Sequence, residues 1–463
     1  MIPTVLGPVD AGVITASCCT REELLHKASP ATMKTLHDNP ITLANLAEIR
    51  SSGDRGRLAA SNRLFSLDES VQELASLGDG AGGGLVMECS AVSDGRDPAG
   101  LADISRRSGV SIVMAASAKE VRDCVTPQPS SESISKDLEN QLLFGDPNIS
   151  HSHSAPSTAP TSTTAAPAGG AASRIQAGFI LVKLYDSNSS SSFPVRQGTA
   201  TATPTAPPAE TALLAGGNSS SADDTAIGLE GAIKAQQATG APLMLAFSHF
   251  IRWTTVEAAL AVVTAQRGDT SDADASRPRQ VIVAGMHGGV SQPLPGHAAL
   301  LSEGVTLCFD CFGRVEWSPG SDYYPSDEES AVRIAELVRL GFAERILLSS
   351  GVSRRIHLSR FGGHGYGHAL RTVPPRLRRL GVSAEDVELM IRLNILRLLD
   401  WFTPPPPLEI PKDYVPCSWC RKRFEPVEGE YFHKFQFVYC GIKCLRGHRD
   451  TGFDADAVAK GAA

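Results

Sequence analysis

The sequence predicts an α/β fold built on a parallel sheet, followed by a small cysteine-rich module. Short apolar runs alternate with helical patterns along most of the chain, which is typical of βα units. The chain has 463 residues, of which 42% are hydrophobic, so it is long enough for one large domain with appendages. Four cysteines form two closely spaced pairs near the C-terminus, which indicates a separate module.

Eight short apolar runs are candidates for the strands of the sheet. They are Val13-Ile14 and residues 85–87, 111–114, 179–182, 243–245, 280–283, 305–309 and 345–348. Helices are expected between the strands, including 331–340 and 384–399, where apolar residues recur at helical spacing. Eight such units fit a (β/α)8 TIM barrel, although an open parallel sheet satisfies the same pattern.

Two segments interrupt this pattern, residues 126–173 and 187–224. Both are rich in Ser, Thr, Ala and Pro. Such a composition buries too little apolar surface to offset chain entropy, so we predict two disordered insertions. A run of four prolines at 404–407 predicts a stiff linker over 403–411, between a barrel at 1–402 and a module at 412–450, with a tail at 451–463.

Composition narrows the class of protein. The formal net charge of -7 is mild, so charge alone selects neither nucleic acid nor a membrane as partner. The chain has no apolar run of about 18 residues and no signal-peptide pattern at its start, so we expect a soluble, cytoplasmic protein. Its ten cysteines are too sparse for a disulfide scaffold and are expected to be thiols or metal ligands.

The C-terminal cysteines predict a structural zinc site. Cys417-x2-Cys420 is followed after 19 residues by Cys440-x3-Cys444, and four thiolates at this spacing supply a closed tetrahedral site. His448 is an alternative to Cys444 as the fourth ligand. The layout resembles treble-clef zinc fingers of the MYM or FCS type. Residues 412–450 hold eight Lys or Arg against five Asp or Glu, so a protein partner is favoured over nucleic acid.

Several motifs carry a family resemblance. They include Thr-Val-Leu-Gly-Pro-Val at 4–9, Gly-Gly-Gly-Leu-Val-Met-Glu at 82–88, Asp-Cys-Phe-Gly at 310–313 and Gly-Gly-His-Gly-Tyr-Gly-His-Ala-Leu at 362–370. In these blocks the chain resembles phosphotriesterase-related proteins of the amidohydrolase superfamily. The resemblance implies a TIM barrel rather than an open sheet. It also implies a metal-dependent hydrolase of amides or esters, for instance N-acyl amino acids of the taurine type.

The metal ligands that the resemblance implies are replaced in this chain. The family has a His-x-His pair at the end of the first strand, a bridging carboxylate or carboxylated Lys on a middle strand, two further His on later strands and an Asp at the last. The residues that align with them are Ser17, Cys18 and Cys19, then Val182, Ala246, Met286 and Gly351. We therefore expect a non-catalytic barrel that acts as a scaffold or ligand-binding body.

A rebuilt metal site is the alternative interpretation. Cys19, Lys183, His249 and His287 are its candidate residues. Lys183 lies on the same face of its strand as Leu181, where a phosphotriesterase-type Lys aligns, but a lone Lys there is more often part of an ion pair.

Three further features have both a functional and a structural interpretation. Glu88, followed by Arg96-Asp97, is either a pocket wall or a buried Glu paired with Arg. The loop 362–368 indicates a retained pocket shape. The Arg-rich segment 354–379 has no acidic residue and is either an anion-binding surface, nucleic acid included, or an exposed helical face.

Overall fold

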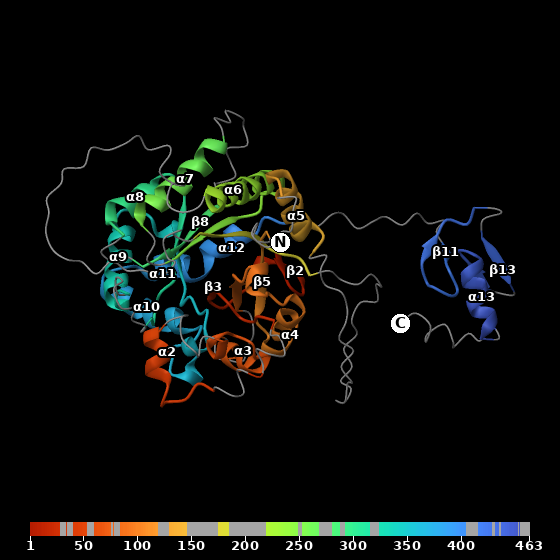
Figure 1. Cartoon of the computed structure of the whole chain (residues 1–463), viewed down its shortest axis with the longest axis horizontal. Helices are drawn as coiled ribbons and strands as arrows, with labels where there is room; N and C mark the ends of the chain where they lie inside the picture. Colours follow the sequence, from red (N-terminus) through yellow and green to blue (C-terminus); the bar gives the residue numbers. More distant parts are fainter. Residues whose placement is uncertain are drawn as a thin grey trace. The chain divides into compact units, whose positions relative to one another are not determined.

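The computed structural model divides the chain into two compact units, Met1–Thr403 and Pro404–Ala463 (Figure 1). The structure describes residues 1–27, 34, 40–52, 60–75, 77, 84–118, 129–145, 175–184, 219–248, 252–267, 280–287, 292–314, 324–403, 415–427, 431–434, 437–451 and 453. The predicted linker at 403–411 lies outside these residues except for Thr403. Along the described residues, no helix is long and apolar enough to cross a membrane.

The first unit is built on eight parallel strands that follow one another in chain order. The strands are β3 (Cys18–Glu22), β4 (Leu85–Glu88), β5 (Ser111–Ala116), β6 (Phe179–Leu184), β7 (Leu243–Phe247), β8 (Val281–Met286), β9 (Thr306–Phe309) and β10 (Ile346–Leu348). Each strand pairs with the next, so the order in the sheet runs from β3 to β10 without a crossover. Seven of the eight predicted strands are confirmed.

Hydrogen bonds between the first and last strands nearly close the sheet into a barrel. The Thr20 hydroxyl donates to the Leu348 carbonyl at 3.2 Å, and the Arg21 amide donates to the Ser349 hydroxyl at 3.0 Å. Beyond the strands, the Glu23 amide donates to the Val352 carbonyl at 2.7 Å. The prediction of a TIM barrel rather than an open sheet is therefore confirmed.

Helices surround the sheet (Figure 1). The α-helices are α2 (Leu46–Ser52), α3 (Leu67–Leu74), α4 (Pro98–Ser108), α5 (Ser131–Leu143), α6 (Ser219–Thr239), α7 (Trp253–Arg267), α8 (Leu294–Ser302), α9 (Asp327–Arg339), α10 (His368–Arg379), α11 (Ala384–Glu388) and α12 (Asn394–Leu399). Short 3-10 turns are η1 (Ala11–Val13), η3 (Ala60–Asn62), η4 (Val92–Asp94), η6 (Ala343–Arg345), η7 (Arg355–His357) and η8 (Ser359–Phe361). The helices predicted at 331–340 and 384–399 are confirmed, and a π-helical turn, η9 (Leu389–Leu393), lies within the second.

Two apolar clusters form the core of the first unit. One lies inside the sheet and includes Phe179 and Leu181; the other lies between the sheet and the helices and includes Ile180 and Leu184. This alternation follows the period of two along a strand. Lys183 continues the inward-facing series, so its ammonium group points into the barrel at the carboxyl end of β6. The hairpin of β1 (Ile2–Thr4) and β2 (Gly7–Val9) precedes the barrel and bonds to β5 through Val5.

The first strand differs from its prediction. Val13 lies in the 3-10 turn η1 with 60% of its surface exposed, and the first barrel strand is Cys18–Glu22. This strand ends in Arg21 and Glu22, whose charges hide it from an apolar pattern. Pairing with groups on distant strands allows these charges to be buried, and the local sequence does not reveal such pairs.

The first predicted insertion also needs correction. Residues 131–143, inside the range 126–173, form α5, in which Ile134, Leu138 and Leu142 are buried at helical spacing. A short amphipathic helix is hidden there by the polar composition around it. The helix α6 begins at Ser219, inside the range 187–224. The rest of both ranges, apart from residues 129, 130, 144 and 145, lies outside the described residues.

The second unit contains two short hairpins and a helix. Strand β11 (Val415–Pro416) pairs with β12 (Arg423–Phe424), and β13 (Phe432–Lys434) pairs with β14 (Phe437–Tyr439). The helix α13 (Ile442–Asp450) follows.

If α5 belongs to the barrel core, truncating its buried face will destabilise the barrel. We expect Leu138→Ala to lower the free energy of unfolding by about 2–4 kcal/mol, because a buried Leu side chain is replaced by a cavity. Lys136→Ala changes an exposed position of the same helix and should shift it by about 0.5 kcal/mol or less. Guanidinium titration followed by circular dichroism measures both. Equal, small effects would show that α5 does not contribute to the core.

Candidate functional site

The carboxyl end of the first barrel strand carries charged residues in place of the expected cysteines. Ser17, Cys18 and Cys19 lie at the amino end of β3, so their alignment with the ligand pair that ends this strand is wrong. The Cys19 thiol packs in the outer core and donates to the Tyr366 carbonyl at 3.4 Å, away from the barrel interior. The residues at the carboxyl end are Arg21, Glu22 and Glu23.

Lys183 forms an ion-paired triad at the mouth of the barrel. Its Nζ lies 2.7 Å from Glu23 Oε1 and 2.7 Å from Asp94 Oδ2. The second oxygen of Glu23 lies 3.3 Å from His26 Nε2. Burial raises the pKa of Glu23, but Lys183 and His26 outweigh this effect and hold the pKa well below its ordinary value. The interpretation of Lys183 as a barrel-interior ion-pair residue is confirmed.

A second ion pair joins the first strand to the seventh. The Arg21 guanidinium lies 2.7 Å from Asp310 Oδ2, and Asp310 is completely buried. The same carboxylate oxygen accepts a hydrogen bond from the Gly285 amide at 2.9 Å. The predicted motif at 310–313 therefore supplies a counterion for Arg21. Sequence reasoning missed Arg21, Glu23 and Asp94, although Thr-Arg-Glu-Glu at 20–23 is an unusual charged run at the end of a buried strand.

Glu22 fastens the loop after the last strand to the first strand. Its carboxylate accepts from the Ser349 hydroxyl at 2.7 Å and from the amides of Ser350 and Val352 at 3.1 and 2.5 Å. Burial raises the pKa of Glu22 to about 8, and the hydrogen bonds from Ser349 and Val352 oppose that rise. These hydrogen bonds to the Glu22 carboxyl group therefore help to close the barrel.

Gly351 occupies the position of the family's last ligand in a conformation that suits glycine. Its φ is 63°, and a Cβ at this position would collide with the Asp310 carbonyl oxygen. An Asp at 351 would therefore require the backbone to move.

The remaining barrel candidates do not converge on one site within the described residues. His287 follows β8 and is 1% exposed; its amide donates to Gln292 Oε1 at 2.9 Å. Ala246 lines the barrel interior, whereas Met286 packs in the outer core. His249 lies outside the described residues.

Glu88 and the glycine-rich loop are both hydrogen-bonded to residues just after the first strand. Burial raises the pKa of Glu88, which accepts hydrogen bonds from the amides of Ser90 and Leu24. In the loop 362–368, the buried Tyr366 donates its hydroxyl to the Glu23 carbonyl at 2.9 Å. The loop is therefore packed against the charged end of the first strand.

Acidic residues from other elements neutralise much of the Arg-rich segment 354–379. Glu69 on α3 lies 2.7 Å from Arg355, and Glu328 on α9 lies 3.5 Å from Arg376 and 3.3 Å from Arg379. These pairs favour the interpretation of an ion-paired protein surface over a nucleic-acid site.

Removing the charge of Lys183 should destabilise the barrel. We expect Lys183→Met to cost about 3 kcal/mol, because two largely buried carboxylates lose their cation. Lys234→Met is the matched control, since Lys234 also pairs with two carboxylates, Glu132 and Glu230. Its side chain is 35% exposed, against 15% for Lys183, and both partner carboxylates are exposed, so its effect should be much smaller. Denaturant titration of each variant measures the free energy of unfolding.

The pH dependence of stability in wild type and in Lys183→Met gives a second test. With its pKa lowered in the fold, Glu23 stabilises the protein above its ordinary pKa, and this contribution is lost as the pH falls. The stability difference between wild type and Lys183→Met should therefore narrow as the pH falls below about 5, where an unfolded glutamate begins to take up a proton. A constant difference would contradict the ion-pair interpretation.

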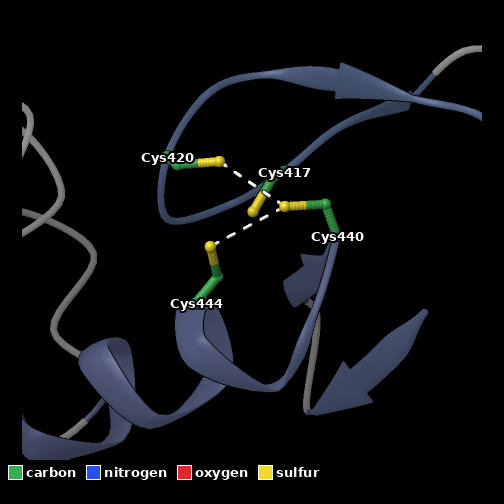
Figure 2. Close-up of side chains that lie close together, drawn as sticks. All are labelled: Cys417, Cys420, Cys440 and Cys444. Atoms are coloured by element: carbon green, nitrogen blue, oxygen red, sulfur yellow. Dashed lines mark hydrogen bonds between the residues drawn. The ribbon is translucent and has the colours of Figure 1, made fainter. Parts of the chain in front are cut away.

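Four cysteine sulfurs converge in the C-terminal unit (Figure 2). The ligand atoms of Cys417, Cys420, Cys440 and Cys444 all lie within 4.8 Å of one another. Cys440 Sγ is 3.6 Å from Cys420 Sγ and 3.7 Å from Cys444 Sγ. Four sulfurs at about 2.3 Å from a zinc ion would be separated by about 3.8 Å, whereas a disulfide requires about 2.05 Å. The cluster therefore has the dimensions of a tetrahedral zinc site.

The surroundings of the cluster favour the thiolate form of one ligand. Burial raises the pKa of the Cys417 thiol, but hydrogen bonds from the amides of Cys420, Cys440 and Trp419 outweigh it and lower the pKa to about 7. Thiolates are the form that binds metal. Among the described residues, no other group of three or more His, Cys, Asp or Glu side chains brings its ligand atoms this close together.

His448 belongs to the core of the module. It is fully buried, its Nδ1 lies 2.9 Å from the Tyr439 hydroxyl, and its ring packs against those of Trp419 and Phe437. Cys444 contributes the fourth sulfur of the cluster, so the geometry favours Cys444 over His448 as the ligand.

This assignment predicts different outcomes for two substitutions. We expect Cys444→Ser to lose most of the bound zinc, because a closed site loses one of four ligands. His448→Phe should keep about one zinc per chain and lower only the stability of the module. Zinc analysis by mass spectrometry, with thermal unfolding as the second readout, distinguishes the loss of a zinc ligand from the loss of core packing. Retention of zinc by Cys444→Ser and its loss from His448→Phe would reverse the assignment.

Comparison with known families supports both units. Residues 223–399 match the model of the phosphotriesterase family, and residues 412–456 match that of the Vms1-associating treble clef domain. The predicted treble-clef resemblance is confirmed by the second match.

Similar proteins are found among curated sequences and solved structures. The phosphotriesterase homology protein of Escherichia coli (strain K12) is 36% identical over 95 residues, 20% of this chain and 30% of that protein. An N-acetyltaurine hydrolase of Dictyostelium discoideum is 34% identical over 99 residues, 21% of this chain and 27% of that protein. The matches thus span less than a third of these relatives. A resiniferatoxin-binding protein from Rhodobacter sphaeroides shares the fold, with a TM-score of 0.61 at 22% identity over 86% of this chain and 94% of that one.

Proposed function

Because this chain joins a barrel of the phosphotriesterase family to a Vms1-associating treble clef domain, we propose that it is a non-catalytic relative of metal-dependent hydrolases. In this proposal the barrel serves as a scaffold or ligand-binding body. The treble clef domain holds a structural zinc ion and binds a protein partner.

One observation carries the proposal: protein cations lie at the strand ends where the family places its metals. Lys183 on β6 and Arg21 on β3 point their positive charges at Glu23, Asp94 and Asp310. A divalent ion needs such carboxylates as ligands, and it would be repelled by cations held 2.7 Å from them. The ion pairs thus supply the charge balance that metal ions would otherwise provide.

The geometry of the last strand end supports the same conclusion. Gly351 stands where the family's Asp aligns, and its left-handed backbone leaves no room for a Cβ beside Asp310. Restoring a ligand at this position would require the backbone to move.

In the C-terminal unit, Cys417, Cys420, Cys440 and Cys444 are the residues that would hold zinc. A bound zinc ion would link the hairpin of β11 and β12 to the start of α13. All four ligands come from the protein, which leaves no open position for chemistry. The name of the domain family, Vms1-associating, favours a protein partner for this unit over nucleic acid.

Metal content tests the proposal. We expect about one zinc per full-length chain and none in a chain that ends at Phe402, measured by mass spectrometry without chelators. The full-length Cys420→Ser/Cys440→Ser variant is the control, because it removes the cluster and leaves the barrel intact. One or two metals retained by the truncated chain or by this variant would overturn the proposed loss of the barrel site.

A hydrolase with a rebuilt metal site is the second candidate. It is favoured by the relatives named N-acetyltaurine hydrolase, and Lys183, His249 and His287 are its remaining candidate residues. This candidate predicts release of acetate from N-acetyltaurine by the purified protein. Such activity, abolished by Lys183→Ala and His287→Ala, would replace the scaffold proposal.

A further inference from the structure

The C-terminal unit carries exposed cations in two segments that adjoin its cysteine cluster. Three follow Cys420 directly, and two lie on α13. We call them the basic face: Arg421, Lys422, Arg423, Lys443 and Arg446. All five side chains are exposed, and none has an ion-pair partner among the described residues of the unit. By contrast, Arg449 on the same helix lies 3.3 Å from Asp450.

The cysteine cluster brings the two basic segments to one place. Arg421 directly follows Cys420 in the sequence, and Lys443 directly precedes Cys444. The sulfurs of these two cysteines lie within 4.8 Å of each other (Figure 2). Arg421 has a φ of 60°, which turns the chain sharply after Cys420. Trp419 packs so closely on Gly447 that a Cβ there would lie 2.8 Å from its Nε1, so the cysteine turn rests on α13.

The charge of the cluster does not account for all five cations. Four thiolates around one zinc ion leave a net charge of about -2, which two neighbouring cations would balance. Three of the five then remain, and the exposed carboxylate of Glu425, two residues after Arg423, offsets one of these. An excess of this kind on a small unit attracts an anionic partner.

The chemistry around the basic face distinguishes between anionic partners. Ile442, adjacent to Lys443, is an apolar side chain with 46% of its surface exposed, and Phe424, next to Arg423, is half-buried. A protein segment with carboxylates and apolar side chains would match both kinds of group. The phosphate backbone of a nucleic acid would match only the charges.

We propose that the basic face binds an acidic protein segment that also carries apolar residues, with Ile442 as the apolar contact. This inference rests on the proposed partner-binding role of the treble clef domain and names the chemistry of that partner. Charged contacts would guide the segment to the face, and Ile442 would add specificity.

Binding of a defined peptide to the full-length protein tests the inference. The probe is a fluorescein-labelled peptide of about 20 residues that contains Asp, Glu and Leu, and anisotropy is measured at low and high salt. We expect Lys443→Glu/Arg446→Glu to weaken binding at least about tenfold, and Ile442→Ala to weaken it by about threefold or more. The control Lys136→Glu/Arg378→Glu makes the same change in net charge at exposed positions of the barrel and should leave binding unchanged.

Three outcomes would overturn the inference. These are failure of the peptide to bind at low salt, equal loss of binding in the control variant, and tighter binding of an RNA oligonucleotide of the same charge. Zinc content and thermal unfolding of each variant show that the module is intact. Metal found in the barrel would overturn the scaffold proposal without altering the peptide result, so the two failures can be told apart.

Discussion

Pairing of buried charge at the mouth of the barrel is the constraint on which the rest of the first unit depends. Arg21, Glu22, Glu23, Lys183 and Asp310 lie at strand ends where water has little access. A charge in such a place is tolerated only with a counterion or several hydrogen bonds. Each partner here comes from a different strand or loop, so satisfying the charges also decides how the strand ends approach one another.

The same constraint connects closure of the barrel with its proposed loss of chemistry. A hydrolytic metal site must gather ligands and still keep a coordination position open. In this barrel the carboxylates at the strand ends are occupied by Lys183, Arg21 and the amides after β10. Groups held in this way stabilise the fold, and in the proposed scaffold they would not be available to activate water.

The stability of the C-terminal unit is limited by its small size. A module of about 40 residues buries too little apolar surface to be stable without a crosslink or a metal. Its described core is a group of aromatic rings around His448, and the cysteine cluster joins the hairpin to the helix beside it. The cluster therefore also fixes where the exposed cations of the basic face lie, which makes the proposed binding surface dependent on the proposed zinc.

The sequence by itself determined the features that depend on local pattern. Seven strands followed from short apolar runs, the four-cysteine cluster from cysteine spacing, and the similarity to the phosphotriesterase family from motifs such as that at 362–370. The helix α5 was missed because its apolar residues stand among polar, low-complexity neighbours, although Ile134, Leu138 and Leu142 keep helical spacing.

Only the tertiary structure decided what the charged residues do. The strand Cys18–Glu22 was missed because its charges are compensated by residues about 290 to 330 positions away, and no local pattern encodes such pairs. For the same reason, Arg21, Glu23 and Asp94 were not recognised as the groups at the barrel mouth. Spacing favoured Cys444 as the fourth ligand and left His448 as an alternative, and packing against Tyr439 placed the histidine in the core. Sequence spacing limits which residues can meet, whereas burial and long-range pairing decide which of them do.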